Sequence, residues 1–110
     1  TYRAIVEFET PVEDLEKLKK LEGAIITQRT PSRVLRRRSD KIRKRKIKKI
    51  EYKLLSKKKV KLEITAQSGL YVKELITGDG GRTEPSVSGL LNNKVKNVEL
   101  DVIKVHDGEI

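Results

Sequence analysis

Short stretches of alternating hydrophobic and polar residues predict most of the strands in this chain. Residues 2–8 alternate with every even-numbered position apolar, which is the pattern of a strand with one buried face. Residues 24–28 form a second short candidate. Residues 47–66 contain two alternating runs joined by a lysine-rich turn at 56–59, which predicts a β-hairpin. Residues 98–102 alternate again and predict a final strand.

The segments between these runs predict short helices. Thr10 can cap a helix that begins with Pro11, and the glutamate three positions after Thr10 completes a capping box. Apolar residues then recur at every third position over residues 12–21, and Gly23 is expected to end this helix.

Two later segments and one basic segment complete the prediction. Residues 85–91 favour a short helix capped by Thr83 or Ser86, whereas residues 71–76 fit either a helix or a strand. Residues 29–46 have almost no apolar periodicity, so we expect an extended, mobile basic loop. Without repeats or a flexible linker, the chain reads as one α+β unit, an antiparallel mixed sheet with short helices.

The positive charge of the chain is concentrated in one segment. The net charge of the 110 residues is +10, but residues 29–61 hold 17 Lys/Arg and two acidic residues, a balance of +15. The remaining residues carry 9 basic and 14 acidic side chains, a balance of −5. Clustered cations gain affinity for nucleic acid by releasing its counterions, so the segment predicts a phosphate-binding surface. A lysine-rich solvated face remains the alternative.

Composition excludes several other classes. The chain has no cysteine and a single histidine, His106, so we expect no disulfide framework and no metal site. It has no apolar run long enough for a membrane span and no signal peptide, which favours a cytoplasmic protein. It also begins without a methionine, directly in a predicted strand, which indicates a fragment of a longer protein.

Residues 67–91, QSGLYVKELITGDGGRTEPSVSGLL, combine features that packing alone does not require. Lys73 stands in an apolar run, where an ammonium group is costly to bury without a carboxylate partner. The adjacent Glu74 is one candidate partner, although neighbouring residues point apart. A surface lysine is the alternative. The following GDGGRT turn does not match a phosphate-binding P-loop, so nucleotide hydrolysis and a nucleotide cofactor are rejected. Asp79 is expected to fix this turn or to pair with Arg82, which could also grip phosphate.

The arginine-rich string RTPSRVLRRR begins at Arg29, and the string YRA begins at Tyr2. Together with the GLYVKEL and GDGGRT strings, they resemble the C-terminal part of the catalytic domain in the Pus-ten family of archaeal-type tRNA pseudouridine synthases. The resemblance covers almost all of residues 1–110. One departure is Arg36, which stands where the family pattern has a histidine.

The resemblance implies an isomerase that converts T-loop uridines of tRNA to pseudouridine without a cofactor, with uridine 55 as the expected target and uridine 54 as a second candidate. It implies that the basic residue Lys73 pairs with the nucleophilic aspartate and that Tyr2 stacks on the flipped base. Leu100 would pack against the same aspartate. By pattern alone, Tyr2 is equally a core-edge aromatic and Leu100 a core leucine of a strand.

The resemblance also implies that residues 38–47 are a mobile thumb loop that grips tRNA. The candidate RNA-binding residues are Arg29, Arg33, Arg36, Arg37, Arg38, Lys41, Arg43, Lys44, Arg45, Lys46 and Arg82.

The nucleophile itself is missing from this chain. Its five aspartates are Asp14, Asp40, Asp79, Asp101 and Asp107, and none lies in the Arg-x-Asp context of the family. We therefore expect an N-terminal half of the same protein to supply the nucleophile and this chain to be inactive alone. A non-catalytic, ribosomal-protein-like RNA-binding module is the main alternative. A scaffold that binds acidic proteins is supported by charge alone.

Overall fold

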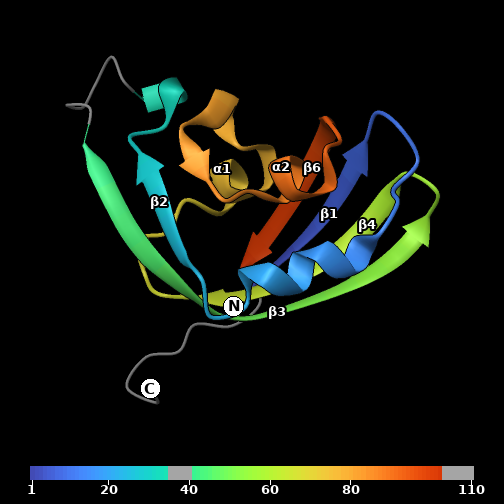
Figure 1. The fold of residues 1–110 in the computed structure, drawn as a ribbon, viewed down its shortest axis with the longest axis horizontal. Helices are drawn as coiled ribbons and strands as arrows, with labels where there is room; N and C mark the ends of the chain where they lie inside the picture. The colour runs from blue at the N-terminus through green and yellow to red at the C-terminus, as the bar shows by residue number, and fades with distance from the viewer. Residues whose placement is uncertain (35–40, 103–110) are drawn as a thin grey trace.

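Six strands form one curved sheet in the computed structural model, which describes residues 1–34 and 41–102. The sheet wraps around a group of short helices that lie in its hollow (Figure 1). The elements in chain order are β1 (Tyr2–Phe8), η1 (Leu15–Leu21), β2 (Ile25–Arg29), η2 (Ser32–Val34), β3 (Ile42–Ser56), β4 (Lys59–Ala66), α1 (Val72–Thr77), η3 (Asp79–Gly81), β5 (Thr83–Glu84), α2 (Val87–Leu91) and β6 (Val95–Val102).

The strands lie in the order β5-β2-β3-β4-β1-β6. All pairings among the described strands are antiparallel, so the α+β class is confirmed and the sheet is not mixed in this part of the chain. The long strand β3 pairs with β2 through its first residues and with β4 through the remainder. A register shift between Ile47 and Lys49 marks a bulge, which bends β3 where it changes partner.

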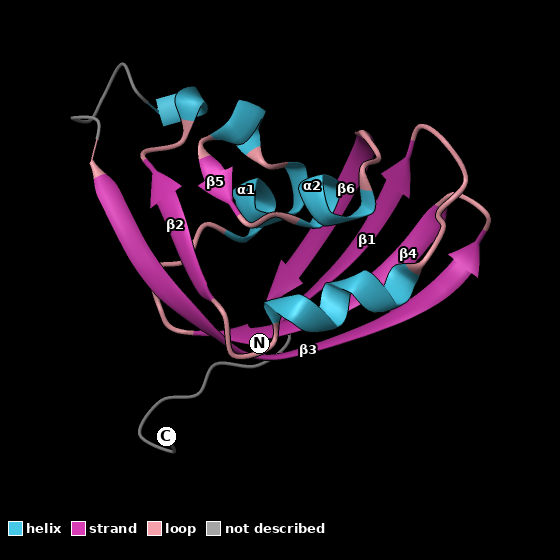
Figure 2. Cartoon of the chain, in the orientation of Figure 1, coloured by secondary structure: helices cyan, strands magenta, loops and turns pink. Residues whose placement is uncertain are grey.

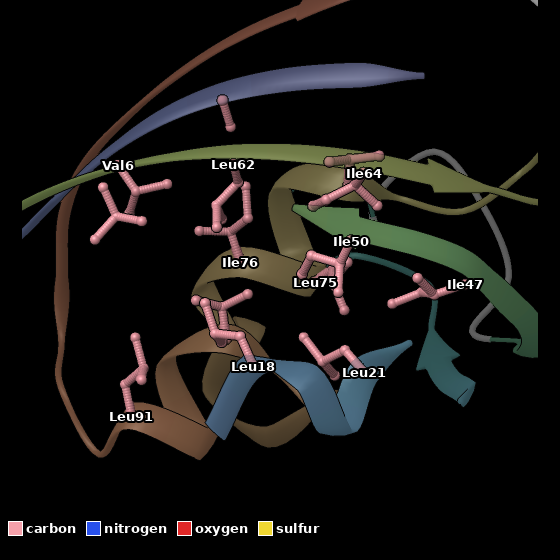
Figure 3. Packing of buried hydrophobic residues seen from close by; sticks show 14 of the residues in the cluster. Val6, Leu18, Leu21, Ile47, Ile50, Leu62, Ile64, Leu75, Ile76 and Leu91 are labelled. Atoms are coloured by element: carbon pink, nitrogen blue, oxygen red, sulfur yellow. The ribbon is translucent and has the colours of Figure 1, made fainter. Parts of the chain in front are cut away.

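The helices face the inner side of the curved sheet (Figure 2), and the hydrophobic core lies between them and the sheet (Figure 3). Leu18 and Leu21 of η1 and Leu75 and Ile76 of α1 are fully buried. The sheet side of this core consists of Val6, Ile47, Ile50, Leu62 and Ile64, as Figure 3 shows. The core is aliphatic apart from Phe8, as the composition predicts.

The alternating patterns located the strands well. The prediction for residues 2–8 coincides with β1, the predicted strand at residues 24–28 is displaced by one residue from β2, and the hairpin is formed by β3 and β4. The final strand begins earlier than predicted, at Val95. The pattern left residues 71–76 undecided between helix and strand, and the structure has helix α1 at Val72–Thr77. Ser86 caps α2 by accepting a hydrogen bond from the backbone N–H of Gly89.

The first predicted helix is wrong in its start and in its type. Thr10 does not cap a helix, because its backbone N–H and its hydroxyl both donate to the side-chain oxygen of Asn93. The Asn93 amide returns a bond to the Thr10 carbonyl at 2.9 Å. The helix instead begins at Leu15 and is a 3₁₀ helix. The three-residue spacing of its leucines fits this geometry, since a 3₁₀ helix has three residues per turn.

The expected loop at residues 29–46 is also partly wrong. Arg29 ends β2, and residues 42–46 belong to β3, where they pair with β2 despite their many cations. The loop assignment is therefore wrong for these residues, and the mobility of the segment stays a prediction. Arg36, Arg37 and Arg38 lie outside the described residues.

Within the described residues, no helix is long and apolar enough to cross a membrane.

The packing predicts unequal costs for two leucines on the same face of the hairpin. Leu62 is fully buried, whereas Leu54 is 49% exposed. Leu62→Ala should lower the free energy of unfolding by about 2–5 kcal/mol, because it removes buried methyl groups and leaves a cavity. Leu54→Ala should cost less than about 1 kcal/mol. Urea unfolding followed by circular dichroism measures both values. Equal losses would contradict the difference in burial between these two leucines.

Candidate RNA-binding and active-site surface

Tyr2 and Leu100 lie on neighbouring strands at one edge of the sheet. In the register of β1 and β6, Ala4 pairs with Leu100 and Tyr2 pairs with Val102. Directly paired residues share a face, so Tyr2 and Leu100 are diagonal neighbours on the inner face, a separation of roughly 7–8 Å. Leu100 is 38% exposed and Val102 is 60% exposed. This edge of the sheet therefore presents apolar side chains to the outside of the chain.

Lys73 lies in the first turn of α1, a helix that contacts β6. It is exposed and forms no ion pair within the described part of the chain, so the apolar run around it does not bury its ammonium group. The neighbouring Glu74 points the other way and is buried. Tyr2, Leu100 and Lys73 therefore come from three elements that are in contact, β1, β6 and α1.

The start of α1 is fixed to the sheet by Gln28. This residue of β2 is 1% exposed. Its side-chain oxygen accepts a hydrogen bond from the backbone N–H of Tyr71 at 2.9 Å, and its side-chain nitrogen donates to the Tyr71 carbonyl at 2.9 Å. The same nitrogen also lies 3.3 Å from the hydroxyl of Thr83. One amide thus bonds both the N–H and the carbonyl of the residue that precedes α1, and that carbonyl also accepts from the N–H of Leu75 at 3.0 Å.

Glu74 is held by Arg33. The Arg33 Nε donates to one carboxylate oxygen at 2.9 Å and its Nη2 lies 3.4 Å from the other. The Glu74 side chain is only 8% exposed, so this pair compensates a carboxylate that would otherwise be costly to bury. The hydrogen bond and the charge of Glu74 raise the pKa of Arg33 above its ordinary value. Because that pKa is already far above neutrality, the guanidinium remains charged throughout the physiological range.

The GDGGRT turn supports the base of the basic segment. Both oxygens of Asp79 accept hydrogen bonds from Ser32, one from its backbone N–H at 2.9 Å and one from its hydroxyl. Asp79 also lies 4.0 Å from the Nε of Arg82, so it both fixes the turn and pairs with Arg82, as the sequence predicted. Gly78 has a φ of 82°, and a side-chain carbon there would lie 2.9 Å from the Ser86 hydroxyl. Glycine is therefore required at this corner.

Thr30 joins the two ends of the segment that contains residues 31–40. Its backbone N–H donates to the carbonyl of Lys41, and its hydroxyl accepts from the N–H of Lys41, both at 2.9 Å. The Thr30 carbonyl in turn accepts two bonds from the guanidinium of Arg82, at 3.1 and 3.2 Å. Arg82 therefore has an internal structural role, and its phosphate contact stays a prediction.

The cations at the start of β3 divide between the two faces of the sheet. Arg43 and Arg45 lie on the inner face, since they pair with Gln28 and Ile26. Arg43 lies 5.3 Å from the centre of the Tyr71 ring, and Arg45 donates to the carbonyl of Ser68. The exposed outer face carries Arg29, Lys44 and Lys46, and Lys41 is exposed just before the strand.

Two surface hollows differ in their fit to RNA. A shallow hollow of about 460 Å³ at the β3 bulge is lined by Lys44, Arg45, Lys48, Gln67 and Ser68, which suits an anion. A larger groove of about 990 Å³ runs between β2, the GDGGRT turn and α2. Its lining does not include Tyr2, Lys73 or Leu100, so the predicted catalytic residues lie outside this groove.

The structure brings forward three residues that the sequence did not single out as site residues. Gln28, Thr30 and Glu74 are all buried and all bind across long sequence separations. Gln28 and Thr30 stand at ordinary strand positions, and nothing in the sequence distinguishes them. Of the three, only Glu74 stands out in the sequence, as an acidic residue next to Lys73 inside an apolar run. The sequence gives no sign that its partner is Arg33, which is predicted there to bind RNA.

Comparison with known proteins identifies the family of the chain. Residues 1–106 match the family model described as Pus10, C-terminal. The chain is 51% identical over 107 residues to the tRNA pseudouridine synthase Pus10 of Methanosphaera stadtmanae, which covers 96% of this chain and 26% of that protein. It is 51% identical over 106 residues to its counterpart from Korarchaeum cryptofilum, with 94% and 28% covered. For the Methanocaldococcus jannaschii protein, the identity is 47% over 113 residues, with 100% and 25% covered.

The chain thus spans about a quarter of the length of the curated relatives it matches. The match covers the strands of Tyr2 and Leu100, the helix of Lys73 and the GDGGRT turn in one alignment. The chain belongs to the Pus10 family and corresponds to its C-terminal domain.

Proposed function

We propose that this chain is the C-terminal part of a tRNA pseudouridine synthase that isomerises T-loop uridines, with position 55 as the expected target and position 54 as a second candidate. The observation that carries the proposal is the family match over residues 1–106, which includes all three predicted catalytic residues. Their placement on β1, β6 and α1 supports a common site, because β6 contacts both β1 and α1.

Each of the three residues has a chemical role that fits its position. Lys73 is exposed at the start of α1 and has room for a carboxylate from outside this chain. An ammonium group beside that carboxylate keeps it ionised, because an opposite charge stabilises the charged form. Tyr2 offers an aromatic face for a uracil extruded from the RNA. Leu100 supplies an apolar wall on the adjoining strand, which limits water around the carboxylate.

The nucleophile comes from elsewhere in the protein. Asp14, Asp79 and Asp101 are the aspartates among the described residues. Asp79 is engaged by Ser32 and Arg82 at the GDGGRT turn, on the loop side of α1. We place the nucleophilic carboxylate in the part of the protein that precedes this chain. That part covers the open edge at β6, where Leu100 and Val102 are exposed.

The cations of β3 and of the segment before it bind the tRNA backbone. Lys44, Arg45 and Lys48 surround a polar hollow, and the outer face adds Lys46. Lysine ammonium groups bind phosphates as point charges, so this surface recognises the fold and charge of tRNA rather than a base sequence. The isomerisation needs no cofactor in this proposal, and the cytoplasm, where tRNA is processed, is the proposed compartment.

The roles of Lys73 and Tyr2 predict distinct kinetic losses in the full-length protein. Lys73→Ala should lower kcat by a factor of roughly 10² or more while tRNA affinity changes little, because the missing charge acts on the reacting carboxylate. Tyr2→Phe should retain more activity than Tyr2→Ala, since phenylalanine keeps the stacking face. Tritium release from uridine-labelled tRNA measures turnover, and filter binding measures affinity.

The 110-residue chain, tested in the same assay, should release no tritium. Pseudouridine formed by this chain alone would overturn the proposed division of the site and would direct attention to Asp79. A full-length Lys73→Ala variant with normal turnover would remove Lys73 from the reaction.

The basic surface predicts a salt-dependent affinity for tRNA. Replacing Lys44, Lys46 and Lys48 by glutamine should reduce the slope of log affinity against log salt by roughly 0.7–0.9 for each phosphate that the protein no longer neutralises. A matched control replaces Lys17, Lys19 and Lys20 of η1, which removes the same charge from a different exposed surface. Its slope should remain close to that of the unmodified protein. Equal reductions in both variants would mean that net charge, and not the β3 surface, determines binding.

A further inference from the structure

The carboxylate of Glu74 is buried on the same short helix that presents Lys73 to solvent. The side chain of Glu74 is 8% exposed, and its two oxygens face the guanidinium of Arg33 at 2.9 and 3.4 Å. Arg33 belongs to η2, the last described turn before residues 35–40. The ion pair therefore connects the entry of the basic segment directly to α1.

A second pair of contacts fastens the same turn to the end of α1. Ser32 donates its backbone N–H and its hydroxyl to Asp79, which follows Gly78 at the C-terminal end of α1. Successive residues of η2 are thus bound to both ends of one helix, Arg33 to its first turn and Ser32 just beyond its last. A turn held at two points has a defined orientation relative to that helix, whereas one contact would allow rotation.

The exit of the basic segment is fastened as well. Lys41 is paired with Thr30 through two hydrogen bonds of 2.9 Å, and the Thr30 carbonyl accepts from Arg82 of the GDGGRT turn. The residues at the two ends of the 31–40 segment are therefore bonded, directly or through Thr30, to α1 and to the turn that follows it. Arg33, the described cation of this segment, is held on the same helix as Lys73 by its ion pair with Glu74.

We propose that Arg33 and Glu74 are positioning residues, which hold the base of the basic segment on the helix of Lys73 so that bound tRNA is aligned with the reacting groups. This inference rests on the proposed function. It reassigns Arg33 from a phosphate ligand to a partner of Glu74. The neighbouring cations supply the affinity for tRNA, and the Arg33–Glu74 ion pair sets the orientation of the bound tRNA.

The test uses the full-length protein in four forms: unmodified, Arg33→Ala, Glu74→Gln and the double variant. Each single change should lower kcat by roughly tenfold to a hundredfold, because small misplacements of bound reactants carry penalties of that order. The dissociation constant for tRNA should change by less than about threefold, and its salt slope should not change. The double variant should be no slower than the slower single variant, since both changes break one ion pair. Arg33→Lys should recover part of the turnover.

The controls separate positioning from a loss of folded protein. Glu63→Gln removes the carboxylate partner of Arg3, an exposed Arg–Glu pair at 3.1 Å on the outer face of the sheet, and should leave kcat unchanged. Glu74→Gln keeps the size and one oxygen acceptor of Glu74, so the test does not depend on the folding of Arg33→Ala. Circular dichroism melting of every variant reports the folded fraction at the assay temperature.

Three results would overturn the inference. The first is Arg33→Ala that weakens tRNA binding and reduces the salt slope while Glu74→Gln does neither, which would make Arg33 a phosphate ligand. The second is single-variant losses that multiply in the double variant, which would make the two residues independent. The third is normal turnover in both single variants. Failure of the proposed function is distinguishable from these three results. In that case the unmodified full-length protein would itself form no pseudouridine.

Discussion

One buried side-chain amide, that of Gln28, joins the sheet to the helix that carries Lys73. The chain enters α1 through Tyr71, whose backbone N–H and carbonyl must both find partners away from water. Gln28 supplies a donor and an acceptor at 2.9 Å each from a strand position that is fully enclosed. A hydrophobic residue there would fill the space but leave the N–H of Tyr71 without its partner. The direction of α1, and with it the directions of Lys73 and Glu74, depends on this amide.

The remaining polar contacts extend outward from that point. The hydrophobic side of α1 packs Leu75 and Ile76 against the sheet (Figure 3), and its polar side holds Glu74 against Arg33. In the turn after α1, Asp79 accepts a hydrogen bond from Ser32, and Arg82 donates to the carbonyl of Thr30. The aliphatic core therefore determines where the helices lie. The hydrogen bonds of Ser32, Arg33 and Thr30 determine how the start of the basic segment is oriented relative to the helix of Lys73.

The strands could be predicted from the sequence because one face of each is buried, and burial of one face imposes a period of two. The same rule failed at residues 42–46, where the inner face carries Arg43 and Arg45 in place of apolar residues. These arginines lie beside Tyr71 and Ser68, which gives their long side chains a packing surface that hydrophobicity alone does not reveal. Thr10 failed as a cap for a similar reason, since Asn93, 83 positions away, offers it a better match.

The site was predicted in part. The grouping of Tyr2, Leu100 and Lys73 came from the resemblance of short motifs to one family, and the family itself is confirmed. Their catalytic roles stay predictions. The buried contacts of Gln28, Thr30 and Glu74 could not be predicted, because each joins residues between 11 and 55 positions apart, and no local pattern records such pairs.

Amide hydrogen exchange around α1 tests most directly whether Gln28 anchors this helix. Gln28→Met keeps the length of the side chain but removes both hydrogen bonds to Tyr71. The amides of Tyr71 and Leu75 should exchange at least about tenfold faster, which corresponds to the loss of roughly 1–3 kcal/mol expected for an unsatisfied buried group. Gln67→Met is the matched control, because Gln67 also accepts a bond from a backbone N–H but is exposed. Unchanged exchange at Tyr71 and Leu75 in Gln28→Met, or equal changes in the two variants, would contradict the account.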